Sequence, residues 1–228
     1  MERAMNSTME QISDFLIVGG PVVWILLGFS VIAVTIFLVK LWQLAMLRAE
    51  SRKNINMALE AWRERDIDGA LAKLSEKRPV ESIVAYSMEA LRHANREVAT
   101  VREEAERRAL NTLHDLRSFL RPLEIIGSLS PLLGLLGTVL GMITAFQQME
   151  GAGAQVDPSV LSGGIWQALL TTAVGIAVAI PVIAMHAWLE RKVERVAHIM
   201  NDSVTQVFTS KEGERLAAVA AREVLHAA

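Results

Sequence analysis

The sequence of 228 residues contains no cysteine. A disulfide framework and a thiolate metal site are therefore excluded, because both need cysteine sulfur. The sequence also shows no strand-like alternation, no internal repeat, no proline-rich linker and no glycine loop following a strand. Without that strand and loop, a nucleotide-binding motif is not expected. The absences favour an all-α fold.

Charge is missing from three long stretches. No Asp, Glu, Lys or Arg occurs in residues 15–39, 125–146 or 160–189, although 21% of the chain is charged. About 20 apolar residues in a helix cross the hydrocarbon core of a bilayer. The pattern therefore predicts three transmembrane helices with these bounds. The first stretch is too long for a cleavable signal peptide and lacks its basic flank, so it is expected to remain as an anchor.

Positive charge is distributed unevenly between the predicted spans. Residues 40–124 carry 16 Lys or Arg and residues 190–228 carry six, whereas residues 147–159 carry none. The positive-inside rule places the two basic segments in the cytoplasm, and residues 1–14 and 147–159 on the outer side. Tryptophans are expected at both membrane interfaces, with Trp24 and Trp166 outside and Trp42 and Trp188 inside.

Outside the spans the apolar periodicity is helical. One apolar stripe lies within the second half of residues 40–124 (Val101, Ala105, Ala109, Leu113, Leu116, Leu120). Another comes directly after the third predicted span (Val193, Val196, Met200, Val204, Val207). Glu103 with Arg107, and Glu104 with Arg108, have the spacing of helical ion pairs. Asp66 is predicted to cap a helix over residues 67–74, and Pro79 to begin another. If that helix runs unbroken into the second span, its cytoplasmic part is about 65 Å long.

Small residues recur along one face of the second and third spans. They fall at steps of three and four (Gly134, Thr138, Gly141, Ala145; Gly164, Ala168, Thr172, Gly175, Ala179). Faces without bulk let transmembrane helices approach closely, and packing drives their association in lipid. We therefore expect the two spans to pack around something through these faces, with Gly134, Gly141, Ala168, Gly175, Pro131 and Pro181 as packing residues. Because one three-helix subunit cannot bury both faces well, a ring is expected.

The same two spans hold polar side chains that need a partner in hydrocarbon. One interpretation is that the threonine hydroxyls only bond back to carbonyls of their own helix within a packing stripe. The other is a polar lining for an ion path, formed by Thr138, Thr172, Gln167 and Thr171. Because Thr171 lies about 100° from Thr172 on the helix, it is expected to contribute less than Thr172.

The motifs SPLLGLLGTVLGMITAF and GGIWQALLTTAVGIAVAIP resemble the second and third spans of the ExbB/TolQ family, to which MotA is more distantly related. The resemblance implies a pentamer of three-span subunits in the bacterial inner membrane, with a periplasmic N-terminus. Such a ring encloses two ExbD/TolR-like single-span partners, each with a membrane Asp, and uses the proton gradient to drive a TonB/TolA-like protein. Thr138 and Thr172 match the family's pore-lining threonines.

Gln167 departs from that resemblance, because typical ExbB and TolQ proteins have Glu there. An amide cannot titrate. The three predicted spans contain no carboxylate and no Lys, and their only ionisable side chain is His186. We therefore expect the acid of any proton path to come from a partner chain.

Other functions find less support in the sequence. The five histidines show no metal-ligand spacing with acidic neighbours, so neither a metal nor another cofactor is expected. Arginines in residues 102–108 alternate with glutamates, which favours a solvated helix face over nucleic-acid binding. No nucleophile, base or metal motif supports an enzyme. An energy-transducing stator and a structural membrane scaffold remain as interpretations.

Overall fold

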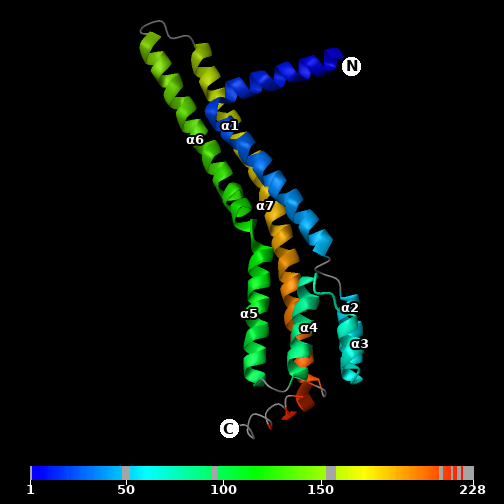
Figure 1. The fold of residues 1–228 in the computed structure, drawn as a ribbon. Helices are drawn as coiled ribbons and strands as arrows, with labels where there is room; N and C mark the ends of the chain where they lie inside the picture. The colour runs from blue at the N-terminus through cyan, green and yellow to red at the C-terminus, as the bar shows by residue number, and fades with distance from the viewer. Residues whose placement is uncertain are drawn as a thin grey trace. The chain divides into compact units, whose positions relative to one another are not determined.

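The computed structural model describes residues 2–47, 52–93, 97–152, 158–210, 213–216, 218–219 and 222, with side chains except those of residues 2–18, 152 and 158–160. The elements are α1 (Glu2–Leu47), α2 (Lys53–Arg63), α3 (Ile67–Ala72), α4 (Pro79–Arg92), α5 (Val98–Arg117), α6 (Leu120–Ala152) and α7 (Pro158–Thr209) (Figure 1). Over these ranges there is no strand. The centre of the predicted 147–159 loop and most of the tail beyond Ser210 lie outside the described residues.

Three helical segments are long and apolar enough to cross a membrane. They are Gly19–Leu47, Leu120–Gly151 and Leu161–Thr209. The prediction of an all-α protein with three membrane spans is therefore confirmed. The chain divides into two compact units, one formed by Met1–Val39 with Phe119–Ala187 and the other by Lys40–Ser118 with Trp188–Ala228.

In the first unit, α1 bends at Gly20 (Figure 1), where the backbone has φ 64° and ψ −165°. A residue with a side chain rarely adopts this conformation, and Pro21 lacks the N–H that would continue the helix. The signal in the sequence is Gly-Gly-Pro inside the predicted first span. After the bend, α1 buries one stripe and exposes the rest, as a helix facing lipid does (buried Val22, Val23, Leu26 and Ala33).

In the second unit, α2 to α5 and the end of α7 share an apolar core. Trp62 is fully buried, and its Nε1 donates to the Val207 carbonyl at 3.2 Å and to Ser210 Oγ at 2.8 Å. This indole therefore ties α2 to the end of α7. The apolar stripe predicted after the third span is buried at four of its five positions (Val193, Val196, Met200, Val207).

Local predictions in this unit are largely confirmed. The Asp66 carboxylate accepts from the Gly69 N–H at 2.9 Å and caps α3, and Pro79 is in the first turn of α4. Glu104 pairs with Arg108 at 2.9 Å as expected, but Arg107 also pairs with Glu104, at 2.7 Å, rather than with Glu103. Hydrogen bonds from these two arginines lower the pKa of Glu104 to about 2.

The helix that begins at Pro79 does not run unbroken into the second span, so the length of about 65 Å does not apply. The helix ends at Arg92, and the next one ends at Arg117 before α6 begins at Leu120. Phe119 has φ 65°, a left-handed conformation that an α-helix cannot contain. Pro122 then lies in the first turn of α6, where its missing N–H costs no helical hydrogen bond.

Candidate functional site

The second and third spans contact each other through glycine backbones. A Cβ placed on Gly175 would lie 2.6 Å from the Ser130 carbonyl oxygen and 3.0 Å from Gly134 Cα. A Cβ on Gly134 would lie 2.9 Å from the Thr171 carbonyl oxygen. No side chain fits at either position, so the two backbones approach as closely as small residues allow.

The contact continues along both helices in opposite directions. Gly127 meets Ile183 near one end, a Cβ on Gly141 would lie 3.3 Å from Ala168 Cβ, and Gly164 meets Ala145. Ascending positions in α6 thus match descending positions in α7, so the pair is antiparallel. The structure brings together Gly134, Gly141, Ala168 and Gly175 from the predicted packing set, while Pro131 is half-buried and Pro181 is exposed.

The three threonine hydroxyls all donate to backbone carbonyls. Thr172 Oγ1 donates to the Gly134 carbonyl at 3.1 Å, across the helix pair. Thr171 Oγ1 donates to the Ala168 carbonyl at 2.7 Å and reaches the same Gly134 carbonyl at 3.3 Å. Thr138 Oγ1 donates within its own helix, to the Leu135 carbonyl at 2.6 Å. Each hydroxyl keeps its lone pairs as acceptors.

Thr138 and Thr172 lie on the same side of the helix contact. At about 100° per residue, Thr138 is rotated about 40° from Gly134, and Thr172 about 40° from Ala168 in the same sense. In an antiparallel pair, equal rotations carry both side chains to the same side. Both threonines are half-buried.

Thr171 lies on the opposite side, rotated about 60° the other way from Ala168. Gly137 has the same rotation from Gly134, and its Cβ position would fall 2.5 Å from Thr171 Oγ1. The Thr171 side chain is 2% exposed, so it fills the contact between the helices. Its hydroxyl is part of the packing between the two helices.

Gln167 lies farther round on that second side, about 100° from Ala168. Its amide nitrogen would be 3.6 Å from a Cβ on Gly20, the residue at the bend of α1. The side chain is half-buried. The four residues predicted to line a path therefore divide into two pairs, Thr138 with Thr172 and Thr171 with Gln167.

Lys40 forms a polar site that the sequence did not reveal. Its ammonium donates to Ser118 Oγ at 3.0 Å, to the Leu116 and Asp115 carbonyls at 3.2 and 3.4 Å, and to Gln43 Oε1 at 2.9 Å. The residue is 2% exposed. A cation at the end of α5 satisfies carbonyls left without a helical donor and suits the negative end of the helix dipole. The sequence suggested only a charge beside the first span.

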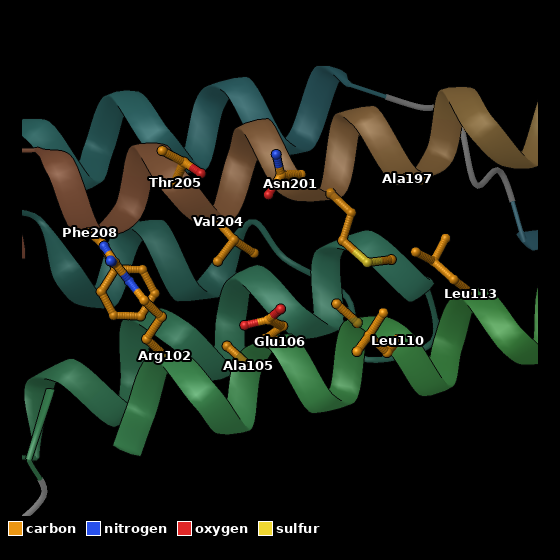
Figure 2. A pocket seen from close by; sticks show the side chains of 12 residues that line it. Arg102, Ala105, Glu106, Leu110, Leu113, Ala197, Asn201, Val204, Thr205 and Phe208 are labelled. Atoms are coloured by element: carbon orange, nitrogen blue, oxygen red, sulfur yellow. The ribbon is translucent and has the colours of Figure 1, made fainter. Parts of the chain in front are cut away.

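A cavity of about 440 Å³ lies between α5 and α7 in the second unit (Figure 2). Ala105, Ala109 and Ala197 belong to its lining, and their small side chains leave space between the two apolar stripes. Arg102 closes one end, with its guanidinium carbon 5.3 Å from the Phe208 ring centroid. The cavity is thus a gap between packed helices, rimmed by polar groups such as Glu106 and Asn201.

These features define a polytopic α-helical membrane protein whose second and third spans are packed as an antiparallel pair. Residues 75–202 match the MotA/TolQ/ExbB proton channel family. The chain is 32% identical to biopolymer transport protein exbB1 of Vibrio cholerae over 188 residues, which is 80% of this chain and 82% of the relative.

Two further relatives extend the comparison. A putative ExbB-like biopolymer transport protein of Synechocystis is 32% identical over 71% of this chain and 77% of its own length. The Tol-Pal system protein TolQ of Haemophilus influenzae is 36% identical over 74 residues, 32% of each chain. The chain belongs to the MotA/TolQ/ExbB proton channel family. That family is one of proton channels.

Proposed function

We propose that the chain is the ring-forming subunit of an inner-membrane motor that converts the proton motive force into work on a TonB/TolA-like protein. Family membership supports a proton-channel subunit for biopolymer transport. An ExbD/TolR-like protein with one span and a membrane Asp then supplies the acid that the spans of this chain lack. The ring, expected to be a pentamer, surrounds that partner, and lipid surrounds the ring.

The pairing of Thr138 with Thr172 carries this proposal. The two hydroxyls come from different helices, lie on one side of the contact and are not fully buried. Their protons are engaged with carbonyls, so they offer acceptors to a protonated carboxyl group or a hydrated proton. Such a surface complements a partner acid without itself titrating.

The orientation in the membrane is part of the proposal. Residues 40–124 and 190–228 face the cytoplasm and residues 147–159 the periplasm, following the distribution of Lys and Arg. Because the chain has no cysteine, single substitutions at Gly151 and at the exposed Glu60 give clean labelling sites. An impermeant maleimide should label Gly151→Cys from the periplasm and Glu60→Cys only after lysis. The reverse pattern would refute the orientation.

One observation favours a scaffold instead. All three threonine hydroxyls are satisfied by carbonyls of this chain, as a packing stripe requires. In that case the hydroxyls contribute only to helix association. The two functions differ in what happens when a hydroxyl is removed without a change in shape.

The deciding experiment replaces Thr172 and Thr138 singly by Val. Valine keeps the shape but loses the hydroxyl, so the protein should still assemble while proton-driven transport falls by well over a factor of about ten, which is the factor that corresponds to one net hydrogen bond. Transport is measured in cells that lack their own copy of the subunit, and assembly is measured as the mass in nanodiscs.

Thr144→Val is the matched control. Thr144 is in the same helix as Thr138 and donates to the Leu140 carbonyl at 2.9 Å, but it is exposed and rotated to the other side. It should leave transport unchanged. Thr171→Val reports on packing and should lower thermal stability more than transport. Full transport in both Thr138→Val and Thr172→Val would support the scaffold.

A further inference from the structure

Gln167 contacts the bend of α1. Among the residues whose side chains are described, its amide nitrogen is the one neighbour within 4 Å of the position that a Gly20 Cβ would occupy, setting aside the chain neighbours of Gly20 and the backbone of its own helix. The amide makes no hydrogen bond with the part of the chain that the structure describes. A half-buried carboxamide in a membrane span therefore has two donors and an acceptor still to be used.

The position of Gln167 separates it from the threonine pair. Five residues of helix place it about 140° from Thr172, but only about 40° from Thr171. Thr171 fills the contact on the side away from Thr138. A group that reaches toward Gln167 therefore approaches α7 from the side of α1 and not from the side of the two half-buried hydroxyls.

The bend releases backbone groups beside this amide. Pro21 has no N–H, so the carbonyl of Ile17 loses the donor that a regular helix would provide four residues later. Gly20 has non-helical φ and ψ, which interrupts the backbone hydrogen bonds of the helix at the same turn. In a membrane span such released groups are satisfied by side chains of neighbouring helices or by ordered water.

We infer that Gln167 is a positioning residue, whose carboxamide satisfies the backbone released at the Gly20–Pro21 bend through one ordered water, and so fixes α1 against α7. It is not a member of the ion path. The statement that Gln167 lies outside the ion path rests on the proposed function. The contact with α1 stands on geometry alone.

The same inference explains why an amide is sufficient at this position. A carboxamide donates at every pH, whereas a glutamate donates only while it is protonated. The contact between α1 and α7 in this chain is therefore independent of pH. Introducing Glu at position 167 should make it depend on pH.

A double-mutant cycle tests the contact in the full chain in nanodiscs, without a partner or a gradient. Gln167→Met keeps length and removes the amide. It should speed hydrogen exchange of the backbone amides of residues 22–26 roughly tenfold, the factor for one net hydrogen bond. Pro21→Ala restores the missing N–H, so in that background Gln167→Met should change exchange less than about twofold. Equal acceleration in both backgrounds, or none in either, overturns the inference.

Transport in the presence of the partner gives the second readout. Gln167→Met should lower transport at every pH. Gln167→Glu should retain transport at low pH and lose it as the pH rises and the carboxyl ionises. Higher proton flux in Gln167→Glu than in the wild type would place residue 167 in the path and overturn the inference. If the exchange results hold but no variant or wild type shows proton-driven transport, the proposed function fails and the positioning role stands.

Discussion

Gly175 shows how much a single residue contributes to the helix pair. The atoms that a Cβ would meet belong to the backbone of α6 and cannot rotate away. Packed interiors tolerate added volume poorly, and overpacking usually costs 1–3 kcal/mol, roughly one to two factors of ten in the folding equilibrium. The hydroxyl of Thr172 reaches the Gly134 carbonyl only while the two helices stay this close.

Gly175→Ala should therefore destabilise the protein by about 1–3 kcal/mol and also reduce transport, because the helices must separate. Thermal unfolding in detergent measures the first effect. Gly163→Ala is the control in the same helix, since no atom of the described residues lies within 4 Å of its Cβ position. Equal stability of the two variants would contradict the close contact.

At the scale of elements, the break between α5 and α6 is supported from a distant part of the sequence. Lys40 and the end of α5 are 75 to 78 residues apart, yet the ammonium donates to two carbonyls and one hydroxyl there. The Asp115 carbonyl also accepts from Ser118, but the Leu116 carbonyl would lose the ammonium. A buried acceptor left without its donor costs about 1–3 kcal/mol.

Lys40→Met keeps the apolar stem and removes the ammonium. We expect a loss of about 1–3 kcal/mol in unfolding free energy and faster hydrogen exchange in the last turn of α5. Lys77→Met, at an exposed position, should change neither quantity. Unchanged exchange at residues 113–117 in Lys40→Met would show that the ammonium does not hold this helix end.

At the scale of the whole molecule, the exposed apolar surface of the spans must be covered by lipid or by other protein chains. Large apolar side chains are exposed over the spans, among them Leu132 at 60%, Leu169 at 61% and Ile180 at 65%. Lipid covers most of such a surface, but Thr138 and Thr172 remain half-buried in one chain. In the proposed ring, these hydroxyls would face the interior.

Assembly is therefore the first prediction at this scale. The mass of the protein in nanodiscs should correspond to a ring, with five copies expected from the family. Helix packing, not the hydrophobic effect, would hold the subunits together in lipid. A stable monomer at working concentration would refute both the ring and a pore formed by this chain.

Proton conduction is the second prediction at this scale. Proteoliposomes containing only this chain should hold an imposed pH gradient, because residues 125–146 and 160–189 contain no carboxylate. Adding the single-span partner should allow flux, and changing its membrane Asp to Asn should abolish that flux, since Asn cannot alternate between charged and neutral forms. Robust proton-selective flux through this chain alone would contradict the division of labour between the two proteins.

Much of the fold was readable from short-range patterns. The three uncharged stretches, the stripes of apolar and small residues, and the caps at Asp66 and Pro79 all depend on residues within a few turns of each other. Such patterns state which face of a helix is apolar or small. They also missed two local signals, the Gly-Gly-Pro bend in α1 and Pro122 in the first turn of α6, because each lies inside a strongly helical stretch.

The sequence alone determined that this protein has three apolar helices and that two of them have faces fit for close packing. Only the tertiary structure decided which polar groups share a side. The rotation of α7 against α6 puts Thr172 on the same side as Thr138 and buries Thr171, and the bend of α1 lies beside Gln167. The tertiary structure also places Lys40 at the end of α5. Periodicity fixes the direction of a side chain around its own axis, but the neighbour found in that direction depends on contacts between segments far apart in the chain.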